Sequence, residues 1–245
     1  MIVFPMAGLS RRFSEAGYSV PKYMLEAHGR SLFSHAVASF SAYFSDIPFL
    51  FIARDVHGTA DFVRRETDKL GISEVRVAII DAPTSGQAET VELGIRRSSV
   101  PAGEPVTIFN IDTFRPSFSF PTEFNHNSVD GYLEVFRGEG VNWSYVRSSG
   151  LSGNRVAETT EKVPISDLCC TGVYHFGSAG LYLDAYDRFK NGLAKKMGLT
   201  ELYVAPMYNL LLHDGRDIRY HLIEAAEVVF CGVPAEYTAF LQRRP

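Results

Sequence analysis

The 245-residue sequence has little cysteine and no long apolar run. Its three cysteines, Cys169, Cys170 and Cys231, show no spacing typical of a zinc site, and their odd number excludes a fully paired disulfide framework. No apolar stretch approaches the ~18 residues that a membrane span requires. The N-terminus lacks the basic segment and apolar core of a signal peptide. We therefore expect a cytoplasmic protein with reduced thiols and no membrane partner.

An excess of positive charge is absent as well. The 24 lysines and arginines are outnumbered by 28 aspartates and glutamates, so the formal net charge is -4. A nucleic-acid binder needs a broad basic face that neutralises phosphates, so we expect no nucleic-acid partner. Hydrophobic residues make up 46% of the chain, which is enough for a sizeable globular core at this length.

Two common phosphate-binding patterns, the P-loop and G-x-G-x-x-G, are missing too. In their place the stretch FPMAGLSRRFSEAGYSVPKYM, residues 4–24, forms a basic bend. Gly8 follows an apolar strand and lets the backbone approach a ligand closely. Arg12 offers a planar fork that suits phosphate oxygens, and Lys22 is held behind Pro21. These residues predict a polyphosphate site, although a solvated loop whose arginines contact nothing also explains them.

The first half of the chain predicts alternating strands and helices. Apolar runs predict strands at 1–6, 48–53, 75–80 and 106–111. Apolar residues at helical spacing predict helices at 32–44, 57–70 and 88–97. Gly71 suits the end of the second helix. This order is typical of a parallel α/β sheet, in which ligands bind at the carboxyl ends of the strands. The expected site therefore comprises 7–22, 81–87 and Asp112.

The second half predicts shorter strands, with a long loop at 116–127. Further strands are expected at 131–136, 143–147, 155–162, 168–176, 217–223 and 227–232, and helices at 179–189, 199–213 and 235–242. Cys169 and Cys170 are adjacent, so they should point to opposite faces of their strand. We expect this half to complete the same sheet and to cover the substrate.

The basic bend resembles the start of the nucleotidyltransferases that make nucleotide-activated sugars. MAGLSRRF and VPKYMLEAHGRSLFSHAV are similar to that family's A-G-x-G-T-R and P-K-x-L-x-x-x-G-x-P-L elements. Ala7, Gly8 and Arg12 match the first element, and Lys22 matches the second. The resemblance implies that the glycine-rich loop and Arg12 hold a nucleoside triphosphate, and that Lys22 contacts phosphate.

Four further motifs follow in the order typical of the family. DAPTSGQAETVELGI resembles the segment that reads the base, which implies that Asp81, Gly86 and Gln87 lie at the nucleotide. FNIDTF resembles the strand that ends in a magnesium-binding acid, which implies that Asp112 is catalytic and binds the metal. A turn-capping role would explain Asp112 equally simply.

AETTEKVPISDLCCTGVYHF resembles the family's acceptor-binding V-E-K-P and T-G-I-Y-x-F elements. The resemblance implies that Glu161, Lys162 and Gly172 form the acceptor site. Simpler explanations stay open, because Lys162 could form an exposed ion pair with Glu161, and Gly172 could mark a bulge in its strand.

The sequence also departs from the family at four positions. Asp81 stands where the family has the glutamine that reads the base. Ser10 replaces a glycine and Arg11 a threonine, so the bend is expected to be stiffer and more cationic than usual. In FCGVPAEYTAF, which resembles the closing D-I-G-T-P-E-x-Y element, Phe230 stands where an aspartate often supplies a second metal ligand. Glu227 is the neighbouring candidate for that ligand, and another group could also supply it. Otherwise Asp112 and the phosphates hold the metal, or catalysis is lost.

Taken over nearly the whole chain, the resemblance implies an α/β fold with a mixed, mainly parallel central sheet flanked by helices. It implies one nucleotidyltransferase domain, with residues 1–115 as the nucleotide-binding half and 116–245 as the acceptor-binding half. The implied enzyme uses Mg2+ to join a nucleoside triphosphate and a small phosphomonoester, such as a sugar 1-phosphate, and releases pyrophosphate. Bacterial capsule or other surface-polysaccharide synthesis is the expected setting, and a homo-oligomer is compatible with the sequence.

Two other functions stay open at this stage. A nucleotide-sugar-dependent glycosyltransferase shares the sheet and an acidic metal site, but its usual D-x-D is N-I-D here and the basic bend is left unexplained. A non-catalytic nucleotide-binding domain is the second alternative, because of Phe230.

Asp81 offers a hint about the base. An ionised carboxylate only accepts hydrogen bonds, so it suits the exocyclic amine of cytosine or guanine and repels O4 of uracil or thymine. We therefore expect a weak preference for CTP, with GTP next. Alternatively, Asp81 points to solvent or caps the helix that begins near Ala88, and backbone groups around Gly86 read the base.

Overall fold

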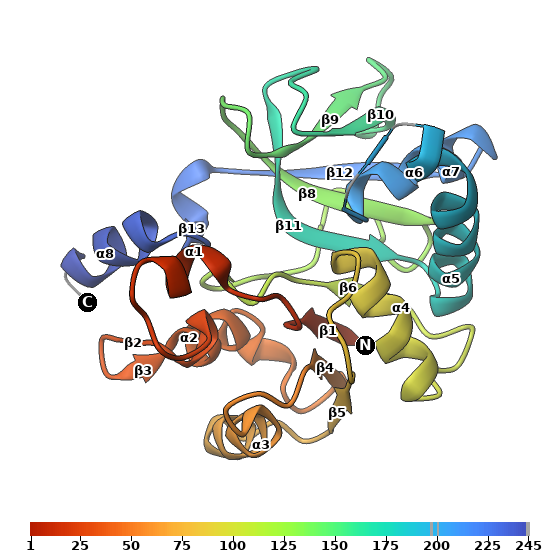
Figure 1. Cartoon of the computed structure of the whole chain (residues 1–245). Coiled ribbons are helices and arrows are strands. Elements are labelled where there is room, and N and C mark those ends of the chain that lie inside the picture. The colour runs from red at the N-terminus through yellow and green to blue at the C-terminus, as the bar shows by residue number, and fades with distance from the viewer. Residues whose placement is uncertain (197, 200, 244–245) are drawn as a thin grey trace.

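The protein is a mixed α/β fold built on one large sheet flanked by helices (Figure 1). The structure is a computed structural model and describes residues 1–196, 198–199 and 201–243. The strands of its nine-stranded sheet are β1 (Ile2–Pro5), β4 (Phe49–Ala53), β5 (Val75–Ile79), β6 (Val106–Ile108), β8 (Gly131–Arg137), β9 (Ser144–Ser148), β10 (Val156–Glu161), β11 (Leu168–Phe176) and β12 (Ile218–Ile223). The expected α/β fold class with a mixed central sheet is confirmed.

Four parallel strands form the part of the sheet that carries the N-terminus. β4 and β6 flank β1, and β5 pairs with the far side of β4. Successive side chains of β1 point to opposite faces of the sheet. Val3 packs with α4 (Gln87–Arg97), and Phe4 packs with α2 (Leu32–Ala38) and α3 (Thr59–Leu70). Because parallel strands end at one edge, the loops after β1, β5 and β6 meet there.

β11 joins this parallel part to the second half of the chain. It pairs antiparallel with β6, β8 and β9, and β12 adds to β8 in parallel. All nine residues of β11 are buried. Cys169 packs in a small cluster with Phe136, whereas Cys170 belongs to the main core, so the two thiols face opposite sides as expected.

Shorter elements complete the chain around the sheet. They are α1 (Arg11–Glu15), η1 (Lys22–Met24), β2 (Glu26–Ala27), β3 (Arg30–Ser31), η2 (Ser41–Tyr43), β7 (Thr113–Phe114), α5 (Ala179–Arg188), η3 (Phe189–Leu193), α6 (Ala194–Lys196), η4 (Ala205–Met207), α7 (Tyr208–His213), η5 (Ala225–Glu227), β13 (Val229–Phe230) and α8 (Pro234–Gln242). β13 pairs with β7 to form a small ribbon beside the main sheet. None of the helices described is both long and apolar enough to cross a bilayer.

Several predicted boundaries were wrong, in one case because the backbone bonds to a distant loop instead of continuing the expected helix. The helix expected at 32–44 ends at Ala38, and the next side chain, Ser39, accepts a hydrogen bond from the Arg115 amide at 2.9 Å. The helix expected at 199–213 begins only at Ala205, because the backbone of Leu202 bonds to residues 85 and 88 instead. Residue 200 of that prediction lies outside the described residues. The strands expected at 106–111 and 227–232 shorten to β6 and β13.

A buried ion pair fastens the segment after β7 to the sheet. Nε of Arg115 lies 3.2 and 3.1 Å from the two carboxylate oxygens of Glu134 on β8, and the side chains are 4% and 0% exposed. The Thr171 hydroxyl donates a further bond of 2.9 Å to Glu134. Burial raises the pKa of Glu134, and Arg115 opposes that shift.

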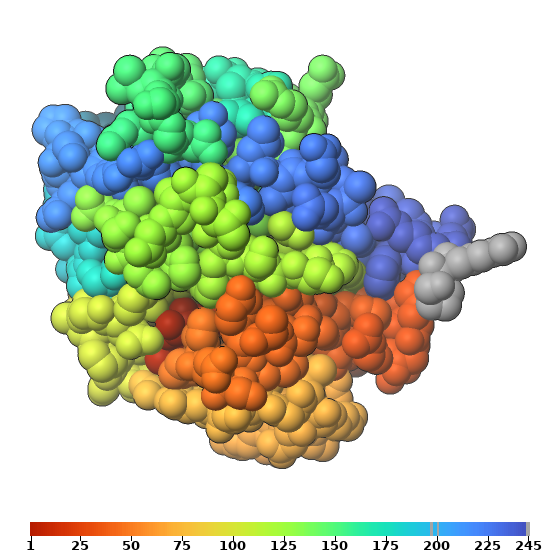
Figure 2. Space-filling view, turned by 180° about the vertical axis from the view of Figure 1, so that it is seen from behind, coloured from red at the N-terminus to blue at the C-terminus, as the bar shows by residue number. Residues whose placement is uncertain are grey.

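On the face of the molecule opposite to that seen in Figure 1, the segment between β7 and β8 forms a band between the N-terminal helices and the C-terminal elements (Figure 2).

Candidate active site

A cleft of about 1000 Å³ opens at the carboxyl ends of the parallel strands. Its volume lies at the upper end of the range of roughly 300–1,000 Å³ that is usual for ligand sites. It is lined by six of the residues predicted from the sequence to bind the nucleotide, Ala7, Gly8, Arg12, Lys22, Gly86 and Gln87. Asp112 lies between these and the predicted acceptor residues Glu161, Lys162 and Gly172, which also line the cleft. Ten predicted residues from distant parts of the chain therefore share one cavity.

The basic bend leaves its guanidinium groups open to the cleft. Ser10 has a φ of 50°, in the left-handed region that favours glycine, so the chain keeps at this position the conformation that a glycine would adopt easily. α1 begins at the next residue, which was not predicted. Arg11 and Arg12 are exposed, and no carboxylate of the described chain lies within ion-pair distance of either. Their charge is thus available to an anion.

Lys22 and Asp112 form an ion pair in the floor of the cleft. The Lys22 ammonium lies 2.5 Å from Oδ2 of Asp112, and the side chains are 22% and 21% exposed. Pro21 sets the start of η1 and so directs Lys22. Asp112 is anchored from the other side, because its carbonyl accepts a 2.8 Å bond from the Cys231 amide. The pair connects the basic bend with the end of β6, 90 residues later.

Glu236 lies beside this pair and was not identified as a site residue from the sequence. A Cβ atom added to Gly232 would lie 3.1 Å from Oδ2 of Asp112 and 3.7 Å from Oε2 of Glu236. Oε2 of Glu236 also accepts bonds of 2.8 and 3.2 Å from the amides of Gly232 and Val233 in a capping box of α8. Burial raises the pKa of the Cys231 thiol to about 12, and Glu236 and Asp112 add to that shift. Negative charge from two carboxylates therefore converges here.

The loop 83–87 is pressed against the second half of the chain. Gly86 has a φ of 146°, and a Cβ there would lie 2.5 Å from the carbonyl oxygen of Leu202, so only glycine fits. Leu202 bonds to both sides of this loop, as its amide donates to Ser85 at 2.8 Å and its carbonyl accepts from Ala88 at 2.9 Å. The loop is thereby held at the edge of the cleft.

Asn110 connects the two sides of the cleft, and sequence reasoning gave it no role. Its side-chain oxygen accepts a 2.6 Å hydrogen bond from Nε2 of the Gln87 side chain. A Cβ on Gly172, which has a φ of 104°, would lie 2.4 Å from Nδ2 of Asn110. Gly172 also lies in the irregular stretch of β11 between Cys170 and Tyr174, so it does mark a bulge. The signal that could have identified Asn110 is its place in the N-I-D at the end of a strand.

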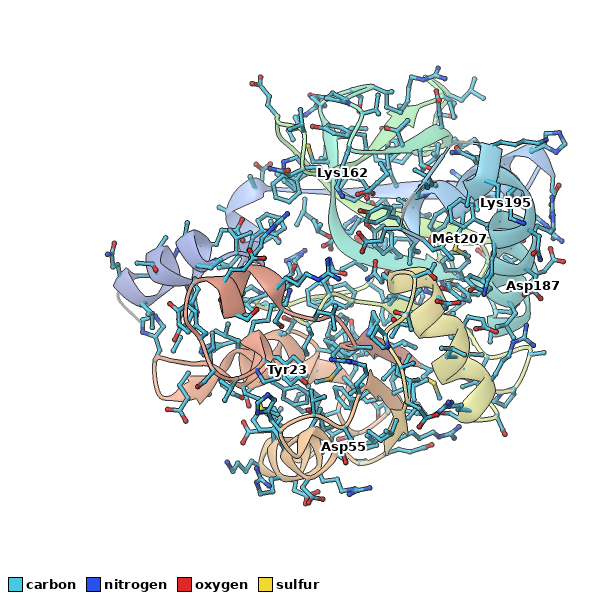
Figure 3. All side chains as sticks on the ribbon, viewed as in Figure 1. Tyr23, Asp55, Lys162, Asp187, Lys195 and Met207 are labelled. Carbon is cyan, nitrogen blue, oxygen red and sulfur yellow. The ribbon has the colours of Figure 1, made fainter. Side chains whose placement is uncertain are left out.

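The residues predicted for the acceptor include one buried acid and an exposed lysine. The side chain of Glu161 is 7% exposed, and burial raises its pKa, although the Ser144 hydroxyl donates to its carboxylate. The Lys162 ammonium contacts the Tyr203 hydroxyl and lies 4.5 Å from the centre of that ring. It lies 4.0 Å from Glu161, at the limit of an ion pair. Figure 3 shows Lys162 on the β9–β11 side of the molecule, whereas Tyr23 lies among the N-terminal helices.

Asp81 does not line the cleft, which corrects one expectation from the sequence. Its side chain is 81% exposed, and its carboxylate lies 2.7 Å from Nη2 of Arg97 at the end of α4. Arg97 holds the pKa of Asp81 below its usual range. The carboxylate thus points toward the outside of the loop, while residues 83–87 line the cavity. The geometry favours the alternative in which groups around Gly86 contact the base.

Replacing Asp81 by glutamine should leave nucleotide preference unchanged. The carboxylate points away from the cavity, so removing its charge should alter the ratio of kcat/KM between any two nucleoside triphosphates by no more than about twofold. Steady-state kinetics with four nucleotides would measure this ratio. A shift of nucleotide preference from CTP toward UTP in the variant would instead show that Asp81 contacts the base.

Glu227 is likewise outside the cleft lining, so it is not placed to be the second metal ligand. Its Oε1 lies 3.2 Å from Nη1 of Arg115, and its other oxygen accepts a bond from the Glu224 amide in η5. Phe230 does line the cleft, and its ring packs 4.6 Å from that of Trp143. Across the described residues, no group of three or more histidine, cysteine or acidic side chains is arranged to hold a metal.

Comparison with solved structures finds a relative that is similar in sequence as well as in fold. A nucleoside-diphosphate-sugar pyrophosphorylase from Vibrio cholerae RC9 shares 51% identity, with a TM-score of 0.95, over 99% of this chain and 100% of that chain. No protein-family profile matches, and a search of curated proteins finds no match.

More distant structures share the fold alone. An inositol-1-phosphate CTP transferase from T. maritima has 15% identity and a TM-score of 0.74, over 98% of this chain and 92% of that chain. A UTP-bound UGPase from Acinetobacter baumannii has 16% identity and a TM-score of 0.68, over 98% and 91%. The fold of this chain is thus similar to that of transferases with different nucleotides.

Proposed function

The chain belongs to the family of nucleoside-diphosphate-sugar pyrophosphorylases, and from this premise we propose that its cleft joins a nucleoside triphosphate to a small phosphomonoester. A phosphate oxygen of the acceptor attacks the α-phosphorus of the triphosphate, and the bond to the β,γ-pyrophosphate breaks. The nucleophile is already an anion, so the reaction needs no general base. The barrier comes from repulsion between two anions and from charge on the leaving group, so positioning and positive charge do the catalysis.

The observation that supports this proposal is the meeting of Arg12, Lys22 and Lys162 around Asp112 in one cleft. Arg12 has no protein partner in the described chain and is exposed at the bend, which suits contact with the triphosphate. Lys22, in the floor, suits the α-phosphate. Lys162 approaches from the other side, where it suits the phosphate of the acceptor. The three cations thus have one phosphate group each to neutralise.

The residues present fit a magnesium ion next to Asp112. A carboxylate is the ligand type that this hard cation prefers, and the Lys22 ammonium at 2.5 Å marks the place as one that accepts positive charge. The missing Cβ of Gly232 leaves space beside that carboxylate. A magnesium ion bound there would supply positive charge for the phosphates. Magnesium dependence is accordingly part of the proposal.

The identity of the nucleotide is best sought among the groups of residues 83–87. Asp81 is exposed and does not line the cleft, so it gives no reason to expect a preference for CTP. Gln87 has a side-chain amide, which both donates and accepts hydrogen bonds and so places no restriction on O4 or N4 of a pyrimidine. A sugar 1-phosphate is the acceptor class that we propose, with supply of activated sugar for surface polysaccharide as the setting.

A pyrophosphate-release screen tests the function directly. Four nucleoside triphosphates would be combined with a panel of sugar 1-phosphates and other phosphomonoesters in the presence of Mg2+. Release that depends on both substrates supports nucleotidyl transfer. A glycosyltransferase or a non-catalytic nucleotide-binding domain releases no pyrophosphate. If no substrate pair in the panel released pyrophosphate, the proposal would be excluded.

Replacing Arg12 by alanine should lower kcat/KM by about 10- to 100-fold. A hydrogen bond to a charged group contributes ~1.5–3 kcal/mol, and this one would be made to phosphate rather than to protein. The melting temperature should change little, because Arg12 is exposed. Arg65→Ala is the control, because Arg65 is an exposed arginine on α3 that does not line the cleft. A variant that unfolds, or one that keeps full activity, would remove Arg12 from the phosphate site.

A further inference from the structure

Two carboxylates border the same small space above Gly232. A single atom placed on that glycine would contact Oδ2 of Asp112 at 3.1 Å and Oε2 of Glu236 at 3.7 Å. Both side chains line the cleft, and they come from different parts of the chain, the loop between β6 and β7 and the first turn of α8. Because residue 232 lacks a side chain, the space between the carboxylates stays free.

A cation already lies at one of these carboxylates. The Lys22 ammonium is 2.5 Å from Oδ2 of Asp112, the oxygen that also borders the space above Gly232. This ion pair shows that positive charge is stabilised at this point of the cleft. A divalent cation at the same oxygen would have to compete with Lys22.

The carboxylate of Glu236 is held in a fixed orientation by the backbone. Its Oε2 accepts the amides of Gly232 and Val233, while Oε1 has no hydrogen-bond or ion-pair partner among the residues described. Carboxylates that bind metals are commonly supported by such hydrogen bonds, which keep a lone pair directed at the ion. Glu236 thus combines an oriented carboxylate with an unused oxygen.

Neither of the two positions considered from the sequence supplies a second carboxylate here. Glu227 pairs with Arg115 at 3.2 Å and does not line the cleft, and position 230 is a phenylalanine that packs on Trp143. Magnesium is often held by only one or two carboxylates, with substrate phosphates and water completing its coordination. Two carboxylates are therefore a sufficient protein contribution at a triphosphate site.

We propose that Glu236 supplies the second carboxylate for a hard divalent cation, beside Asp112, in place of the acid that position 230 lacks. The inference rests on the proposed function and deepens it by assigning the cation site. In this arrangement the missing side chain of Gly232 leaves room between the two ligands. Lys22 neutralises the charge of Asp112 when no cation is bound.

Binding of Mn2+ to the nucleotide-free protein tests the assignment without any turnover. Mn2+ takes the same oxygen ligands, and its free concentration can be followed by electron paramagnetic resonance. Glu236→Gln keeps a side-chain oxygen that can cap α8 but removes the charge, so the Mn2+ affinity should fall by ~10-fold or more. Glu227→Gln is the matched control and should bind as wild type does. Lys22→Met should bind Mn2+ more tightly than wild type, because the competing ammonium is gone.

The outcomes separate this inference from the proposed function. Wild-type affinity in Glu236→Gln, or no Mn2+ binding by the wild-type protein, would overturn the assignment of Glu236 even if pyrophosphate release is observed. A lack of pyrophosphate release with any substrate pair would overturn the function even if the Mn2+ results are as expected. Thermal melting of each apo variant shows whether it is folded. Should Glu236→Gln fail to fold, Glu236→Asp replaces it, and its shorter side chain should weaken Mn2+ binding in the same direction.

Discussion

Replacing Asp112 by asparagine should lower turnover about 100-fold or more, which corresponds to roughly 3 kcal/mol of transition-state stabilisation. The neutral amide is a poor ligand for magnesium, and it also no longer holds the Lys22 ammonium, which lies 2.5 Å from the carboxylate in the native protein. One substitution therefore disturbs both the proposed cation site and the lysine proposed for the α-phosphate. Pyrophosphate release under saturating substrates measures the loss.

The fold should survive this change. Asp112 is 21% exposed, and the bond that its backbone carbonyl accepts from the Cys231 amide does not depend on the side chain. Asp61→Asn is a suitable control, because Asp61 forms an exposed pair with Arg64 on α3, away from the cleft. If Asp112→Asn turns over at a nearly normal rate in a preparation free of wild-type enzyme, Asp112 has no catalytic role.

Replacing Arg115 by methionine should destabilise the protein by ~3–5 kcal/mol, because it leaves the charge of Glu134 buried without its partner. Methionine keeps most of the length of the arginine stem, so the change isolates the loss of the guanidinium. The Glu134 side chain is 0% exposed, and among the described residues only the Thr171 hydroxyl would remain as its hydrogen-bond partner. Urea unfolding followed by circular dichroism would measure the difference in free energy.

Two further variants show whether the charge is responsible. The double variant Arg115→Met with Glu134→Leu should recover most of the lost stability, because a buried ion pair can often be replaced by apolar side chains without net cost. Arg137→Ala removes an arginine from an exposed pair with Asp167 and should cost about 1 kcal/mol or less. A double variant as unstable as Arg115→Met would point to lost packing rather than to unpaired charge.

Much of the fold could be predicted because its elements have strong patterns. The nine-residue strand at 168–176 was predicted with its observed bounds, and the helix that ends at Gly71 does so with a left-handed glycine, as expected. Local pattern failed where distant backbone groups intervene. Leu202 bonds to the loop at 85–88 and so cannot continue a helix, and no property of the residues around it indicates that partner.

The candidate site shows the same division. Ordered motifs predicted ten residues that line one cleft, since motifs record which side chains lie at strand ends. Asp81 was misplaced because sequence spacing does not show on which side of a loop a carboxylate points, and Arg97 attracts it outward. Glu236 was missed because its closeness to Asp112 arises only when α8 packs beside the end of β6.

The pairing of β11 with β6 has a consequence for synthesis of the chain on the ribosome. The four parallel strands are complete once Ile108 has been made, yet one side of β6 stays open until β11 emerges some 60 residues later. An open, apolar strand edge is a template for pairing with other chains. A nascent chain stalled in this interval, or a fragment cut after residue 115, should therefore aggregate or recruit chaperones rather than fold. A separately expressed fragment of residues 116–245 could rescue folding only if it covered that edge before the first fragment aggregated.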